Sequence, residues 1–143
     1  MLIRPWQKDD NQKISSLEKE CFSDAWSQEM IESAFSSPHF SGFVICENQE
    51  VLGYIGGQIL FEQGEILLVA VDKNYRGNGF GKSLVNALIE SFKDRGVEQL
   101  FLEVRVGNSV AISCYERCGF ERIAVRKGYY ADGEDAIIME KKL

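Results

Sequence analysis

The chain has 143 residues, of which 45% are hydrophobic and 27% charged, the size and composition of one globular domain with its own core. Its formal net charge of −6 argues against non-specific binding to nucleic acid or to an anionic membrane surface, since both depend on basic residues. The opening MLIRPWQKDD lacks the apolar stretch of a signal peptide, and the longest apolar run, residues 66–71, is too short to cross a bilayer. We therefore expect a single cytoplasmic domain over residues 1–143.

The N-terminal part of the chain predicts a short strand and two helices. Leu2 to Arg4 form the strand, and Asp9 or Asp10 is placed to cap the helix that follows. A second helix begins after Ser27, a favourable N-cap residue, and ends before Pro38.

Strands dominate the next segment. Residues 43–46 and 51–60 predict a hairpin around the turn sequence ENQE. Residues 66–71 are continuously apolar, which is typical of a central strand buried on both faces.

The C-terminal half alternates helices and strands. A long helix follows Gly79 and is closed by Gly96, with Leu84, Leu88 and Phe92 on its apolar face. The strand QLFLEV comes next, and Asn108 or Ser109 caps a helix that ends at Gly119. Two closing strands, ERIAVR and DAIIMEKKL, flank the loop KGYYADG. The order β-α-α-β-β-β-α-β-α-β-β predicts a mixed α/β fold with a mostly antiparallel sheet flanked by helices.

The four cysteines do not predict a metal site. Cys114 and Cys118 lie one helical turn apart, but the sole histidine, His39, is distant and both cysteines fall on an apolar helix face. We interpret these two, with Cys21 and Cys46, as small core residues in a reducing compartment, and expect no bound metal.

The stretch YRGNGFGKS, at a strand-to-helix junction, suggests a phosphate-binding loop. The P-loop pattern GxxxxGK[ST] needs glycine at position 76, where this chain has Arg76, and the dinucleotide pattern GxGxxG needs a third glycine where it has Lys82. The remaining pattern is Arg-x-x-Gly-x-Gly: Arg76, Gly79 and Gly81. Glycines let backbone N–H groups approach an anion, and the positive end of the following helix adds to the attraction. A glycine-rich turn without a ligand is the alternative.

This pattern resembles the acetyl-CoA-binding signature of the GNAT acetyltransferases. The stretches IRPWQKDD, CFSDAWS, VAVDKNYRGNGFGKSL, LEVRVGNSVAISCYERCGF, and GYY followed by EDAIIME extend the likeness over residues 1–143. They resemble the RimI type in particular, the bacterial enzymes that acetylate the N-terminal alanine of a ribosomal protein. The resemblance implies a single domain with the GNAT acyl-CoA N-acyltransferase fold, acetyl-CoA as acetyl donor, and a protein N-terminus, that of a ribosomal protein, as partner.

The resemblance also implies which residues hold acetyl-CoA. They are the loop residues Arg76, Gly77, Asn78, Gly79, Phe80, Gly81 and Lys82, the strand residues Val69, Ala70 and Val71 through their backbone, and Asn108. The side chain of Asn108 is equally suited to capping a helix. RimI-type sequences often carry basic residues where this chain has Gly77 and Asn78, so we expect Lys82 and the backbone to carry more of the phosphate binding here.

Two residues carry the chemistry that the resemblance implies. Glu103 is the general base, through water; alternatively it is a surface carboxylate paired with Arg105. Tyr115 is the general acid that protonates the leaving thiolate; alternatively it is a packed core tyrosine. A terminal α-amine, with a pKa of about 7.7–8.0, is easily deprotonated near neutral pH and attacks the thioester directly.

Three aromatic residues are weaker candidates for the peptide channel, by the same resemblance: Trp26, Tyr129 and Tyr130. Each is equally suited to a core position. The acceptor itself stays open at this point. A protein N-terminus is expected first, a polyamine or antibiotic amine is the alternative substrate, and a CoA-binding regulatory module without turnover is the alternative function.

Overall fold

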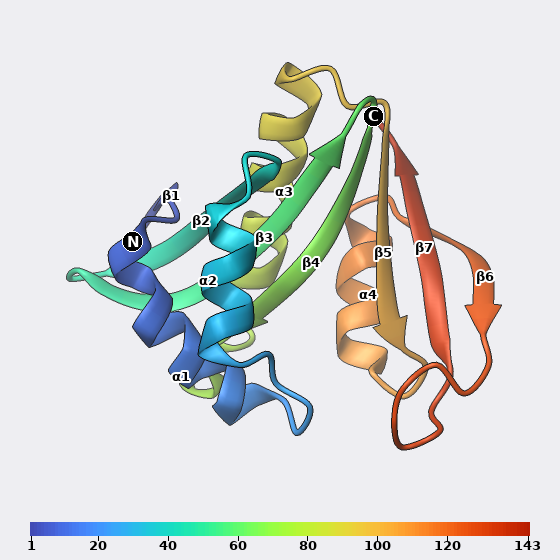
Figure 1. The fold of residues 1–143 in the computed structure, drawn as a ribbon, viewed down its shortest axis with the longest axis horizontal. Helices are drawn as coiled ribbons and strands as arrows, with labels where there is room; N and C mark the ends of the chain where they lie inside the picture. Colours follow the sequence, from blue (N-terminus) through green and yellow to red (C-terminus); the bar gives the residue numbers. More distant parts are fainter.

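The fold is built on one seven-stranded sheet with helices on both faces (Figure 1). The structure is a computed structural model that describes residues 1–143. The strands lie in the order β1-β2-β3-β4-β5-β7-β6, and every neighbouring pair is antiparallel except β4 and β5. The elements are β1 (Leu2–Pro5), α1 (Asn11–Cys21), α2 (Gln28–Ser36), β2 (Phe40–Glu47), β3 (Glu50–Leu60), β4 (Gln63–Val71), α3 (Phe80–Asp94), β5 (Gln99–Arg105), α4 (Ser109–Arg117), β6 (Glu121–Arg126) and β7 (Ala136–Lys142). The predicted mixed α/β order is confirmed, with two short 3-10 turns added at Lys8–Asp10 and Lys73–Tyr75.

Two apolar clusters lie on opposite faces of the sheet. The larger one joins α3 and α4 to the sheet, and the predicted α3 positions Leu84, Leu88 and Phe92 are fully buried in it. The smaller one joins α1 and α2 to β2, β3 and β4, with Ile14 and Ile31 fully buried. The helices are therefore held by the apolar stripes that the sequence shows, which is the main source of their stability.

The helix ends follow the predicted capping residues with one exception. The hydroxyl of Ser27 accepts the N–H of Met30, and the side chain of Asn108 accepts the N–H of Ala111, as N-caps do. Asp10 lies at the N-terminus of α1 but makes no side-chain cap. Its carboxylate instead accepts two hydrogen bonds from Arg4, each 2.9 Å, so a bidentate ion pair has displaced the predicted cap.

The strand β4 differs from the predicted strand that is buried on both faces. Its residues alternate between buried and half-buried, and Leu67 has no partner in β3, because Gly56 pairs with Leu68 and Gly57 with Ile66. Such a β-bulge shifts the alternation by one residue. Beyond it, Val69 and Val71 pack toward the cluster of α3 and α4.

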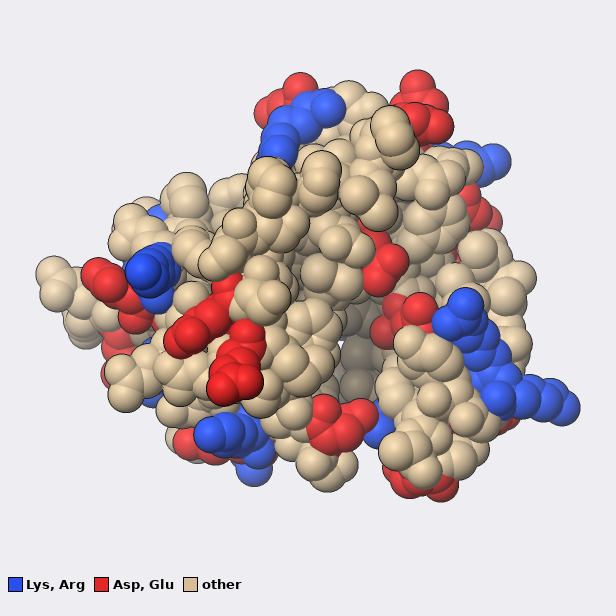
Figure 2. All heavy atoms as spheres, in the orientation of Figure 1, with Lys and Arg blue, Asp and Glu red and all other residues tan.

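β4 and β5 separate along their length. They pair only at residues 63–65 and 99–101, and Figure 1 shows the two strands diverging below that point. The helices α1 and α2 cover β2 to β4, whereas β5, β7 and β6 carry no helix on that face. Figure 2 shows a hollow over the divergence, with acidic side chains around its rim. None of the helices is long and apolar enough to cross a membrane.

Candidate active site

The C-terminal half of β4 has one free edge, facing the gap to β5. The N–H of Asp72 donates to the carbonyl of Leu52 in β3 at 2.7 Å, and Ala70 is the register partner of Tyr54. Because backbone groups alternate in direction along a strand, those of Val69 and Val71 face away from β3. A free edge of this kind can bind an extended ligand through strand-like hydrogen bonds.

The loop after β4 delivers the positive end of a long helix to the same gap. Gly77 and Gly79 have φ values of +83° and +79°, in the left-handed region that favours glycine. The first bond of α3 runs from the N–H of Ser83 to the carbonyl of Gly79, at 3.0 Å. The N–H groups of residues 80–82 precede this bond and have no acceptor within the helix. The N-cap residue is Gly79, which has no side chain to accept them. Uncapped N–H groups and the helix dipole together form a site suited to an anion.

Gly81 faces the gap between β4 and α4. A Cβ atom placed on it would lie 3.7 Å from the Sγ of Cys114 and 4.0 Å from a Val71 methyl group, which are ordinary contact distances. A side chain at this position would therefore fit the protein itself but would project into the space beside the free edge of β4.

The polar side chains of the loop bind the protein. Arg76 Nε donates to the carbonyl of Val71 at 3.1 Å, and the Nδ2 of Asn78 donates to the carbonyl of Tyr75 at 3.1 Å. Phe80 packs against the core, whereas Lys82 is exposed and makes no ion pair. Of the two charged side chains in this loop, that of Lys82 is thus the one that makes no hydrogen bond to the protein.

Tyr115 lies with its ring buried and its hydroxyl unpaired. The residue is 7% exposed and packs edge-to-face on Phe120, with ring centroids 5.9 Å apart. The hydroxyl makes no hydrogen bond within the protein, and its oxygen keeps some contact with solvent. Burial raises the pKa of Tyr115, with smaller effects from Cys114, Cys118 and Tyr130, so the hydroxyl keeps its proton at neutral pH.

Glu103 lies on the helix-free face of β5, where the alternation along the strand places it. Its carboxylate is 3.9 Å from the guanidinium of Arg126, and its side chain is 30% exposed. Arg105, the partner named in the surface-pair alternative, binds other carboxylates instead, so that pairing is wrong. A hydrogen bond to Glu103 raises the pKa of Tyr129. Burial, and then the charge of Glu103, raise the pKa of Glu65 on β4.

Tyr129 and Tyr130 lie in the loop between β6 and β7, whereas Trp26 packs partly against the smaller apolar cluster. Trp26 is half-buried in the α1–α2 loop, where its backbone N–H donates to the buried carboxylate of Glu18 at 3.1 Å. Tyr129 is 48% exposed and contacts Tyr130 edge-to-face at 5.1 Å. Arg105 stacks over the ring of Tyr130 at 4.0 Å. These residues belong to the two loops that flank the helix-free face.

Only two of the four cysteines are buried as predicted. Cys46 and Cys118 are buried, whereas Cys21 and Cys114 are half-buried. The Sγ of Cys21 contacts Arg76 at 3.4 Å, and the Sγ of Cys114 lies beside Gly81. Cys21 packs against the smaller apolar cluster without being fully buried, and Cys114 is half-buried beside Gly81, so the core interpretation holds in full only for Cys46 and Cys118.

An arginine-centred cluster on the same face escaped the sequence analysis. Arg105 Nη2 donates to Asp24 at 2.6 Å, and Nη1 donates to Glu134 at 2.9 Å and to Asp132 at 3.0 Å. The alternation along β5 could have placed Arg105 beside Glu103. No spacing rule could have indicated Asp24, which is 81 residues away in the chain.

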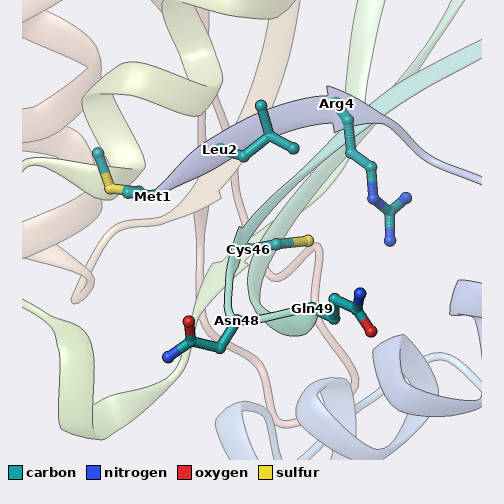
Figure 3. Close-up of a pocket in the computed structure, with 6 residues that line it drawn as sticks. All are labelled: Met1, Leu2, Arg4, Cys46, Asn48 and Gln49. Atoms are coloured by element: carbon teal, nitrogen blue, oxygen red, sulfur yellow. The ribbon is translucent and has the colours of Figure 1, made fainter.

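A cavity at the β1 side of the sheet does not coincide with these residues. It measures about 410 Å³ and is lined by residues of β1 and of the β2–β3 hairpin (Figure 3): Met1, Leu2, Arg4, Cys46, Asn48 and Gln49. It lies at the opposite edge of the sheet from β5, and none of its residues is among the predicted site residues.

Comparisons with known proteins identify the family of this chain. The sequence model of the "Acetyltransferase (GNAT) family" matches residues 11–120. In an alignment 114 residues long, the chain is 39% identical to an N-alpha-acetyltransferase of Saccharolobus solfataricus; the match covers 71% of this chain and 68% of that protein. In an alignment 117 residues long, it is 35% identical to the [ribosomal protein bS18]-alanine N-acetyltransferase of Escherichia coli; the match covers 80% of this chain and 78% of that protein.

The fold is also shared with a relative of known structure. The crystal structure of the ribosomal-protein-S18-alanine N-acetyltransferase from Escherichia coli superposes with a TM-score of 0.92 and 30% identity, over 99% of this chain and 92% of that one. The expected acyl-CoA N-acyltransferase fold is therefore confirmed, and the chain belongs to the GNAT family of acetyltransferases.

Proposed function

We propose that the protein transfers the acetyl group of acetyl-CoA to the α-amine of a protein N-terminus, and that its acceptor is the N-terminal alanine of a small-subunit ribosomal protein. The relatives from Saccharolobus solfataricus and Escherichia coli support the first statement by the activity in their names, and the second relative supports the acceptor. The geometry of the gap between β4 and β5 supports acetyl-CoA as the donor and the roles that we give to Glu103 and Tyr115.

The gap suits acetyl-CoA along its length. The carbonyl of Val71 accepts from Arg76, and the remaining backbone groups of Val69 and Val71 on this edge are suited to an extended chain that carries amides, as the pantetheine arm does. The uncapped N-terminus of α3 and the exposed ammonium of Lys82 are suited to the pyrophosphate. Because Gly81 has no side chain, the space beside Val71 and Cys114 stays open for the ligand. Bound there, acetyl-CoA supplies the activated acetyl group.

Glu103 is suited to receive the proton of the acceptor amine. It stands on the face that Trp26, Tyr129 and Tyr130 flank, at the rim of the hollow, and its partly exposed carboxylate is open to water. Deprotonating a terminal amine at neutral pH costs only about 1–1.5 kcal/mol. A carboxylate that acts through one water molecule therefore suffices as the base.

Tyr115 is suited to return a proton to the leaving sulfur. It approaches from α4, on the other face of the sheet, with a protonated and unpaired hydroxyl. Burial raises the pKa of a thiol as well as that of the hydroxyl, so the apolar surroundings that keep Tyr115 protonated also raise the proton affinity of the leaving thiolate. The amine attacks the thioester carbon directly, the carbon–sulfur bond breaks, and no protein nucleophile is needed.

One observation carries the proposal: β4 and β5 pair only as far as residues 65 and 101, and beyond that point the edge of β4 is open. Glu103 lies on the helix-free face of β5, and Tyr115 comes from α4 on the other face of the sheet. The free edge of β4 lies between these groups, so a thioester held there would have an acid on one side and a base on the other.

The cellular acceptor is identified by mass spectrometry of protein N-terminal peptides from cells with and without this protein. We expect a ribosomal protein that begins with alanine to lose its acetyl group when the protein is absent. An unchanged set of acetylated N-termini, together with acetylation of a polyamine or an antibiotic amine by the purified protein, would assign it to small-molecule acetylation instead.

A further inference from the structure

Arg105 joins two loops that stand on opposite sides of the helix-free face. One is the α1–α2 loop, residues 22–27, which contributes Asp24; the other is the β6–β7 loop, residues 127–135, which contributes Asp132 and Glu134. Asp24 and Asp132 are separated by more than 100 residues in the chain, and the guanidinium is the group that binds both. Its planar fork of five N–H donors can serve three carboxylates at once.

The β6–β7 loop has few other attachments to the body of the protein. Its residues are largely exposed, and β6 before it is exposed throughout. Several of its hydrogen bonds close the loop on itself, such as that from the N–H of Gly133 to the carbonyl of Tyr130. A segment without core contacts opens at low cost, so the ion pairs of Arg105 determine where this loop stands.

Arg105 also orients Tyr130 and the start of α4. The guanidinium lies 4.0 Å from the centre of the Tyr130 ring, as a cation–π contact does. Glu134 accepts the N–H of Gly107 at 2.9 Å with its second oxygen, so the cluster reaches the turn that carries Asn108. Tyr130 is half-buried, whereas Tyr129 beside it is 48% exposed.

Without the guanidinium, three carboxylates would face one another. Like charges at this distance repel, and the two loops would move apart. Their spacing sets the width of the opening through which an acceptor reaches Glu103, two residues from Arg105 on the same strand and the same face. Arg105 therefore contacts both loops and the ring of Tyr130, and it lies on the same face of β5 as Glu103.

We propose that Arg105 is a positioning residue for the acceptor: it holds the α1–α2 and β6–β7 loops at the spacing that lets an acceptor chain bind between them. This inference rests on the proposed function for the identity of the acceptor. Arg105 touches the loops and not the reacting atoms, so its loss weakens acceptor binding in the ground state and the transition state alike. Such a change appears in the KM of the acceptor before it appears in kcat.

The test compares Arg105→Ala and Arg105→Lys with Arg4→Ala. Arg4 makes a bidentate ion pair with Asp10 at the far edge of the sheet, so Arg4→Ala removes a comparable ion pair away from the gap. The substrates are acetyl-CoA and a peptide with a free N-terminal alanine. For Arg105→Ala we expect the peptide KM to rise by about tenfold or more, with the KM for acetyl-CoA changed by less than about twofold.

The two controls sharpen this result. Arg105→Lys should give an intermediate peptide KM, because an ammonium keeps the charge but not the planar fork. Arg4→Ala should keep the wild-type peptide KM. A folded Arg105→Ala with the wild-type peptide KM, or with equal rises in both KM values, would overturn the inference. A wild-type protein that does not acetylate the peptide would instead contradict the proposed function.

Hydrogen exchange provides a readout that needs no acceptor. In Arg105→Ala the amides of residues 127–135 should exchange faster by about tenfold, the equivalent of 1.4 kcal/mol in local opening, while those of α3 keep their rates. Unchanged exchange in this loop would show that other contacts hold it and would overturn the inference as well.

Discussion

Replacing Gly81 with alanine should strengthen the fold and weaken acetyl-CoA binding. Gly81 lies in the first turn of α3, and a methyl group there would sit at 3.7 Å and 4.0 Å from its nearest protein neighbours, without a clash. Since alanine is favoured over glycine inside a helix, the free energy of unfolding should rise by about 0.5–1 kcal/mol. For a chain of this size that raises the melting temperature by roughly 2–4 °C.

The same methyl group should oppose the cofactor. It projects into the gap beside Val71 and the free N–H groups of α3, where we place the pantetheine arm and the pyrophosphate. Loss of one hydrogen bond to a charged group costs about 1.5–3 kcal/mol, which weakens the affinity for acetyl-CoA by roughly 10- to 150-fold.

Gly79→Ala provides the matched control. Gly79 has a φ of +79°, and nothing lies within 4 Å of the Cβ position. Alanine there should lower the free energy of unfolding by about 1–2 kcal/mol, because a side chain disfavours the left-handed conformation. The two variants should therefore shift the melting temperature in opposite directions.

Titration calorimetry and thermal scans with and without acetyl-CoA measure both effects. At 100 times its dissociation constant, acetyl-CoA should add about 2.7 kcal/mol to the stability of the wild type and much less to that of Gly81→Ala. If Gly81→Ala bound acetyl-CoA with wild-type affinity, or if ATP stabilised the wild type and acetyl-CoA did not, the assignment of this gap to acetyl-CoA would be refuted.

Three further predictions concern single side chains. Glu103→Gln should lower kcat by roughly 10²–10⁴-fold at most. The loss should shrink as the pH approaches the amine pKa of about 7.7–8.0, because free amine then forms unaided; a pH-independent loss would contradict the role of base. Tyr115→Phe should lower kcat without recovery at higher pH, and should matter less for an acyl donor whose thiol has a lower pKa; pH profiles parallel to those of Glu103→Gln would show that the roles are misassigned. At Asp10, burial alone would raise the pKa, but the hydrogen bonds from Arg4 and from the N–H of Gln7 outweigh it and hold the pKa below its ordinary 3.8. The ion pair therefore stabilises the fold above that pH and is lost as the pH falls through the lowered value. Asp10→Asn should cost about 1–3 kcal/mol in urea unfolding at pH 7, and a difference from wild type that persists in strong acid would contradict this reasoning.

Local features of the fold were predictable because they depend on nearby residues. The N-caps at Ser27 and Asn108, the left-handed glycines that close α3 and α4, and the face of β5 that carries Glu103 each follow from a few adjacent positions. Hydrophobic periodicity specified the buried face of α3, and Leu84, Leu88 and Phe92 are fully buried there.

The arrangement of the site was less predictable because it depends on contacts between distant segments. The divergence of β4 and β5 results from pairing that stops after three residues, and the bulge at Leu67 is defined only against β3. The partners of Arg105 come from two remote loops. Cys21 and Cys114 share the apolar pattern of core residues but are only half-buried, since a pattern does not reveal where a sheet opens.

The most direct test of the account uses the purified protein, acetyl-CoA and two peptides. One peptide has a free N-terminal alanine and an internal lysine; the other has the same sequence with its N-terminus already blocked. Tandem mass spectrometry locates the added acetyl group. We predict acetylation of the first peptide at its α-amine alone, none of the second, and loss of the product in Glu103→Gln near neutral pH. Acetylation of lysine in the blocked peptide, or turnover of a polyamine with both peptides left unmodified, would contradict the claim that this protein acetylates protein N-termini.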